Sequence, residues 1–142
     1  MINFYIETNF KFSGKKHIKT WIKSLIESKK LIVGNINYIF VDDENILKIN
    51  NQFLSHNYYT DIITFNYNTS KTINADIYIS IDRLKENSKI YKTQFKEEFL
   101  RVIIHGILHL IGFNDSTKNE QSLMRLQENE QLLKIDKSKI II

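Results

Sequence analysis

The order in which extended and helical segments alternate constrains the fold of this chain more than any other feature of its sequence. β-Branched and aromatic runs predict strands, and apolar residues recurring every three or four positions predict helices. We expect strands over residues 2–7, 35–41, 61–67 and 75–80. We expect helices over residues 14–30, 42–53, 81–91, 94–111 and 117–135. This order predicts an α+β fold, with a mixed sheet of about four strands covered by helices.

The chain shows no internal repeat and no linker, so we expect residues 1–142 to form a single domain. The polar stretch 68–74 predicts a long connection between two strands, which could pair as a hairpin. The tail from Asp136 is charged and then apolar, and we expect it to fray.

Composition excludes several classes of protein. The chain has no cysteine, so disulfide frameworks, thiolate metal sites and cysteine nucleophiles are excluded. No apolar run approaches the roughly 20 residues of a membrane span, and the N-terminus lacks a signal-peptide pattern. We therefore expect a cytoplasmic protein with no membrane partner. The net charge of +4 is compatible with nucleic acid as a partner, but it indicates one only weakly.

The segment RVIIHGILHLIGFND, residues 101–115, carries the most chemical information. Four residues of an α-helix rise about 6 Å and return to the same face, so His105 and His109 can converge on one metal ion. Gly112 stands where a left-handed cap would end the helix and turn the chain back. This turn would bring Asp115 towards the histidines. Two histidines and one carboxylate leave a position for water, as catalytic zinc sites do.

Another interpretation is that both histidines are satisfied core residues, because the helix is apolar nearly all round. Asp115 could likewise be an ordinary cap or turn residue. Zinc proteases of the HExxH type carry Glu directly after the first His. Gly106 occupies that place, which argues against a peptidase of that mechanism.

The run HGILHLIGFND at 105–115 resembles the HGxLHLxGYDH signature of the YbeY-type endoribonucleases, the rRNA maturation RNase family. TDIITF at 60–65 is similar to the family's TDVLSF segment, and ADIYIS at 75–80 is similar to its GDIxIS strand. KINNQFL, at 48–54, matches the family's LNxxYR stretch in placement. The resemblance runs from about residue 36 to about residue 130, in the family's order.

The resemblance implies a zincin-like, metal-dependent hydrolase fold with one Zn²⁺ per chain. It implies single-strand-specific RNA cleavage in small-subunit rRNA processing and ribosome quality control, with rRNA and the small ribosomal subunit as partners. By position, His105 and His109 are the first two metal ligands. The family's usual third ligand is His, and Asp115 stands there. Carboxylate also binds zinc, so we expect Asp115 to be the third ligand.

A second departure concerns a cation. The family usually has Arg six residues before the Thr of its TDVLSF segment, and this chain has Leu54 there. An Arg at that place could pair with a phosphate and stabilise developing charge, which Leu cannot do. The candidate catalytic replacements are Arg101, one turn before His105, and His56. Arg101 could instead pair with a glutamate of its own helix, Glu97 or Glu98, and His56 could be an exposed loop residue.

Thr60, Asp61 and Thr64 could form a cleft wall near the metal, with Asp61 supporting a ligand, or they could simply cap a strand. Tyr58 and Tyr59 could stack on unpaired bases or belong to the edge of the core. Two other functions stay open. One is a ribosome-assembly or RNA-binding factor with a mainly structural metal, and the other is a metal-dependent hydrolase with a non-RNA substrate. The oligomeric state is not predicted.

Overall fold

A computed structural model describes residues 1–55 and 60–142, and its elements follow the predicted order. The strands are β1 (Ile2–Ile6), β2 (Ile32–Val41), β3 (Ile62–Asn66) and β4 (Thr72–Ser80). The helices are α1 (Lys15–Ser28), α2 (Asp43–Leu54), α3 (Ile81–Ile90), α4 (Phe95–Leu110) and α5 (Lys118–Leu132), followed by a 3₁₀ turn at Lys137–Lys139. The predicted α+β class is confirmed.

The sheet is mixed and four-stranded, as predicted, with the order β1-β2-β4-β3. The β1–β2 and β2–β4 pairs are parallel, whereas β3 and β4 are antiparallel. Strands β2 and β4 begin earlier than predicted, because Ile32 and Val33 pair with Thr72 and Ile73. The connection between β3 and β4 is correspondingly shorter than the expected loop over 68–74.

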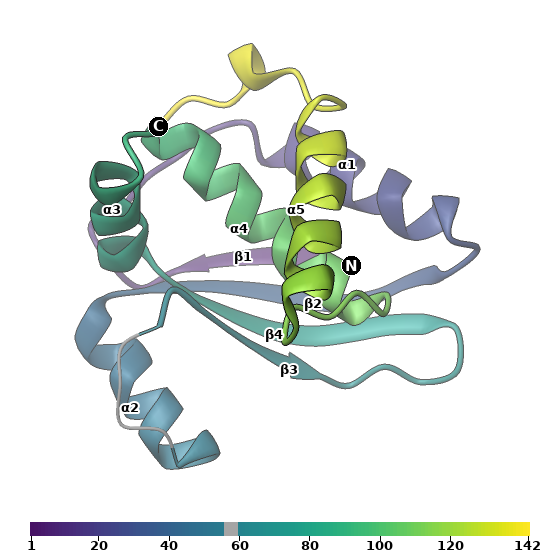
Figure 1. The fold of residues 1–142 in the computed structure, drawn as a ribbon, viewed down its shortest axis with the longest axis horizontal. Coiled ribbons are helices and arrows are strands. Elements are labelled where there is room, and N and C mark those ends of the chain that lie inside the picture. Colours follow the sequence, from purple (N-terminus) through teal and green to yellow (C-terminus); the bar gives the residue numbers. More distant parts are fainter. Residues whose placement is uncertain (56–59) are drawn as a thin grey trace.

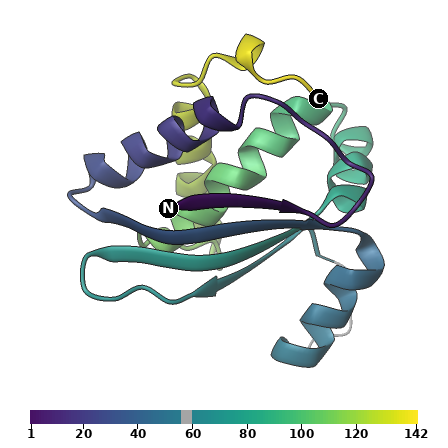
Figure 2. The ribbon, with the colours of Figure 1, turned by 180° about the vertical axis from the view of Figure 1, so that it is seen from behind.

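Helices cover the two faces of the sheet unequally. Figures 1 and 2 show α1, α3, α4 and α5 over one face and α2 on the opposite side. The larger group of buried apolar side chains lies under the four helices, and it includes the apolar side of α1, which is Ile18, Trp21, Ile22, Leu25 and Ile26. A smaller group, which includes Ile39, Ile46 and Ile63, lies under α2. The Asp42 side chain caps α2 by accepting a hydrogen bond from the Asn45 backbone N–H at 2.8 Å.

Helix α4 lies at the centre of the thicker layer, between the sheet and α5 (Figure 1). Its Phe99 ring is fully buried and lies 5.5 Å from the Phe40 ring of β2, measured between centroids. A Cβ added at Gly106 would lie 3.2 Å from Ile62 and 3.3 Å from Ile77, so this glycine lets the helix approach the sheet closely. Among the described residues, no helix, α4 included, combines the length and the hydropathy that crossing a bilayer requires.

The expectation that the tail from Asp136 frays was wrong. Ile140 is fully buried in the main core. The backbone N–H of Ser13 donates to the carbonyl of Ile141 at 2.8 Å, and the Ile141 N–H donates back to the Ser13 carbonyl at 3.3 Å. The apolar end of the tail therefore has a binding place beside the start of α1, where burial and two backbone hydrogen bonds offset the cost of ordering it.

Candidate metal centre

One face of α4 carries the candidate site. Arg101, His105 and His109 follow one another at intervals of four residues, and this places them along a single line on the helix. The centroids of the two imidazole rings lie 4.5 Å apart, and the rings are nearly perpendicular at 84°. Their side chains are 20% and 31% exposed, so both rings are accessible from the surface.

The turn after α4 brings a carboxylate to this face. Gly112 has φ +114°, the left-handed conformation that favours glycine, and its N–H donates to the His109 carbonyl at 3.1 Å. The chain then reverses. Asp115 Oδ2 lies 3.4 Å from His105 Nε2 and 3.3 Å from His109 Nε2. The three predicted ligand residues are thus brought together.

This cluster has the donor set of a divalent metal site. One ligand atom each from His105, His109 and Asp115 lies within 4.8 Å of the other two. Two imidazole nitrogens and one carboxylate oxygen suit Zn²⁺ and similar ions, and three protein ligands leave a coordination position open. All three residues are partly exposed, so an ion and a substrate can reach the cluster.

A buried carboxylate that the sequence analysis missed lies beside His105. Glu128 of α5 has a side chain only 7% exposed, and its Oε2 lies 2.6 Å from His105 Nδ1. Its other oxygen, Oε1, accepts a hydrogen bond from Arg101 Nη1 at 2.9 Å. Arg101 therefore pairs across to α5, and its expected alternative partners, Glu97 and Glu98, are not the ones it uses.

The three groups shift one another's proton affinities. Burial alone would raise the pKa of Glu128, but hydrogen bonds from His105 and Arg101 and their positive charges bring that pKa below its usual value. Burial alone would lower the pKa of His105, but the Glu128 hydrogen bond and the charges of Glu128 and Asp115 raise it overall. The charged forms of both groups are therefore favoured in the folded protein.

Two hollows flank the cluster. One, of about 450 Å³, is lined by the cluster, by Thr60 and Asp61 just before β3, and by residues of β3 that include Thr64. The other, of about 410 Å³, lies towards α5 and is lined by Arg101, Glu128 and others. Asp61 borders both hollows. Burial raises the pKa of its carboxyl, and the nearby positive charge of His105 opposes that rise. The predicted cleft wall is thus in place beside the histidines.

Leu54, which stands where the family usually has Arg, ends α2 with its side chain 41% exposed. The other candidate cation, His56, and the candidate stacking residues Tyr58 and Tyr59 lie outside the described residues. Their predicted roles stay predictions.

Comparison with known proteins identifies the family. A family model described as "Endoribonuclease YbeY" matches residues 3–136. This chain belongs to the endoribonuclease YbeY family. It is 46% identical over 131 residues to an endoribonuclease YbeY of Christiangramia forsetii, covering 92% of each chain. It is 40% identical over 137 residues to one from Karelsulcia muelleri, covering 96% of this chain and 97% of the relative.

A solved structure supports the same conclusion for the fold of this YbeY-family chain. The solution structure of TM1509 from Thermotoga maritima superimposes with a TM-score of 0.66 at 27% identity. The match covers 94% of this chain and 91% of the other. The resemblance inferred from the histidine segment and the two strand segments is therefore confirmed across nearly the whole length of the chain.

Proposed function

We propose that this chain is a metal-dependent endoribonuclease that cleaves single-stranded RNA, with small-subunit rRNA processing and ribosome quality control as its role. One observation carries the proposal: the ligand atoms of His105, His109 and Asp115 converge within 4.8 Å in a chain of the YbeY family. The curated relatives are named endoribonucleases. The corresponding partners are rRNA and the small ribosomal subunit, and the corresponding location is the cytoplasm.

We propose Zn²⁺, one per chain, as the ion, because two histidines and a carboxylate also hold the metal in catalytic zinc sites. His105 and His109 would bind it through Nε2, and Asp115 through Oδ2, the atoms that already face one another. When bound, such an ion supplies positive charge that polarises a phosphoryl oxygen and activates water. An aspartate in place of a third histidine lowers the charge of the site, but carboxylate is an ordinary zinc ligand.

The residues around the cluster would hold the RNA. Arg101 borders the same hollow as His105 and Asp115, which supports a part for its guanidinium in placing a phosphate near the ion. His56 is the second candidate for this catalytic charge, because it follows Leu54 closely in sequence. Asp61 and Thr64 line the hollow on the other side of the histidines and would limit which groups approach them.

Two measurements test the proposal. The first is the metal content of the purified protein, compared with a His105→Ala/His109→Ala double variant and with His17→Ala as a control on the exposed side of α1. The second is cleavage of single-stranded RNA with and without a chelator. We expect about one metal per chain in the wild type and in the control only, and cleavage that the chelator abolishes and Zn²⁺ restores.

The other outcomes are equally informative. Leu54 in place of a cationic residue favours a second candidate function, an rRNA-binding assembly factor whose metal is mainly structural. A bound metal without RNA cleavage would support that function. Cleavage of single-stranded DNA in preference to RNA would point to another substrate. Absence of metal from all three proteins would remove the site and leave two partly exposed histidines beside Asp115.

A further inference from the structure

We propose that Glu128 is a positioning residue that fixes which nitrogen of His105 faces the metal, with Arg101 holding Glu128 in place. This inference rests on the proposed metal site and adds a residue to it. Glu128 comes from α5, 23 residues after His105 in the chain, yet its Oε2 lies 2.6 Å from His105 Nδ1. This contact is shorter than the 2.9 Å hydrogen bond between Arg101 and Glu128, and shorter than the 3.4 and 3.3 Å that separate Asp115 from the two histidines.

The geometry of that contact selects one tautomer of the imidazole. An ionised carboxylate has no hydrogen to donate, so a neutral His105 must carry its proton on Nδ1 and donate it to Glu128. The lone pair is then on Nε2, which is the atom 3.4 Å from Asp115 Oδ2 in the cluster. Metal-binding histidines usually have such a partner for the second ring nitrogen, which fixes the ring and raises its basicity.

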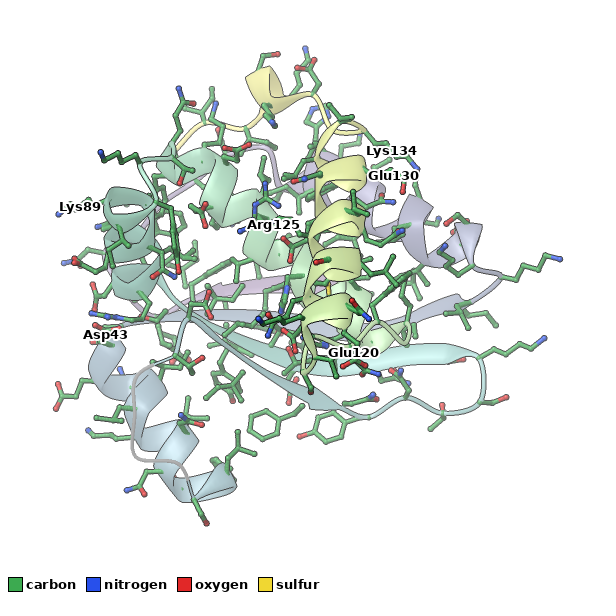
Figure 3. The ribbon with its side chains drawn as sticks, in the orientation of Figure 1. Asp43, Lys89, Glu120, Arg125, Glu130 and Lys134 are labelled. Carbon is green, nitrogen blue, oxygen red and sulfur yellow. The ribbon has the colours of Figure 1, made fainter. Side chains whose placement is uncertain are left out.

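The carboxylate is itself held rigidly. Glu128 is 7% exposed and Arg101 is 15% exposed, and their hydrogen bond of 2.9 Å uses the oxygen that does not face His105. Arg125 approaches the same oxygen from the solvent side, at 3.6 Å, with its side chain 58% exposed. Figure 3 shows Arg125 on α5, with Glu130 nearer the C-terminal end of the helix and Lys134 just beyond that end. Each Glu128 oxygen therefore has its own partner, and the side chain cannot rotate without breaking both contacts.

A purely structural ion pair between α4 and α5 is the alternative. Such a pair would affect the stability of the fold, but changing Glu128 would leave the metal affinity of each folded molecule unchanged. Metal affinity therefore separates a positioning role from a structural one, whereas the tautomer of His105 tests whether the hydrogen bond leaves Nε2 free for an ion.

The first measurement needs no variant. Long-range ¹H–¹⁵N spectra of the metal-free wild type, at a pH where His105 is neutral, report which ring nitrogen carries the proton. We expect the proton on Nδ1. A proton on Nε2 would overturn the proposal, because Nε2 could not then face an ion with its lone pair.

The second measurement compares Glu128→Gln with Glu130→Gln, the same change on an exposed position of the same helix. Zn²⁺ affinity is measured by competition with a chromophoric chelator, and circular dichroism of the metal-free proteins checks that both are folded. We expect Glu128→Gln to bind Zn²⁺ about 10–100-fold more weakly, and Glu130→Gln to match the wild type. Equal affinities of the two variants would overturn the proposal.

The design keeps this inference apart from the proposed function. If the wild type binds Zn²⁺ tightly, and Glu128→Gln weakly, but neither cleaves RNA, Glu128 positions a ligand in a protein that is not a nuclease. If RNA is cleaved but the Glu128→Gln affinity is unchanged, the function stands and the positioning role fails. If Glu128→Gln does not fold, a proton on Nε2 of His105 in the wild type would still overturn the proposal.

Discussion

The two faces of α4 differ in chemistry although they belong to one helix. Towards the sheet, Phe99 and Ile103 are fully buried among apolar side chains. Towards α5 and the turn that follows α4, Arg101, His105 and His109 are 15%, 20% and 31% exposed. Burial of the first face stabilises the fold because it removes apolar area from water. The charges on the second face must be paired, because removing them from water is costly. The apolar face thus sets where the helix lies, and the polar face carries the chemistry.

The largest effect is expected on the sheet-facing side. Phe99→Ala removes a ring that contacts the rings of Phe12 and Phe40 at centroid distances of 5.1 and 5.5 Å. We expect the free energy of unfolding to fall by about 4 kcal/mol, through lost burial and a cavity, measured by urea denaturation. The Zn²⁺ affinity of the molecules that stay folded should not change. A large loss of affinity would show that the two faces are not independent.

Arg101→Met tests the polar face. It leaves the buried Glu128 carboxylate without its arginine, and removing one partner of a buried pair costs about 3 kcal/mol of unfolding free energy. Unlike Phe99→Ala, this variant should also weaken Zn²⁺ binding, because Glu128 is no longer held. Unchanged stability in urea would mean that solvent or Arg125 compensates for the missing guanidinium.

Tyr38→Phe probes a polar contact between the sheet and the sheet-facing side of α4. The buried Tyr38 hydroxyl donates to the Ile103 carbonyl of α4 at 2.9 Å, so its loss should cost about 1 kcal/mol of unfolding free energy near neutral pH. The metal site should be unaffected, and a change in Zn²⁺ affinity would again contradict the separation of the two faces.

The same variant has a predictable pH dependence. Burial raises the pKa of Tyr38 well above its usual value. A raised pKa in the folded state gives a contribution that is complete below the unfolded pKa of about 10 and is lost as pH rises through the folded pKa. The wild type should therefore lose stability above about pH 10 more steeply than Tyr38→Phe does. Parallel stability curves for the two proteins in alkaline urea titrations would contradict this.

The smallest effect is expected at the exposed end of the polar network. Arg125→Gln removes a partner of Glu128 that lies at 3.6 Å and is 58% exposed. Pairs of this kind contribute about 0–1 kcal/mol, so stability should change by less than about 1 kcal/mol and Zn²⁺ affinity should stay near that of the wild type. A larger effect would place Arg125 inside the network and not at its edge.

Local sequence patterns predicted most of the fold and the ligand residues of the candidate site. The class, the element order and the mixed sheet follow from the periodicity of apolar residues. The convergence of His105 and His109 follows from their four-residue spacing and the pitch of a helix. The tail was mispredicted because its binding place near Ser13 is distant in sequence. Such tertiary contacts decide whether a terminal segment is ordered, and local pattern does not contain them.

Glu128 was missed for a related reason. It stands in the polar run QENEQ, where another glutamate, Glu130, is exposed and indistinguishable by residue type. A usable signal was present: Met124 and Leu132 are buried on α5, and Glu128 lies one turn from each on the same face. A charged residue within an apolar stripe must have a partner when the helix packs, and this indicates a buried ion pair. The sequence alone does not say which helix supplies that partner.

With an ion bound at the candidate cluster, the position of Glu128 on α5 would also link metal supply to the amount of folded protein. The candidate ligands lie on α4 and the turn after it, and their support comes from α5, so a bound ion would join three successive pieces of the chain. An ion that binds only the folded state adds about 2.7 kcal/mol of stability at a free concentration one hundred times its Kd. A cell that runs short of the ion would then lose protein molecules to proteolysis as well as activity.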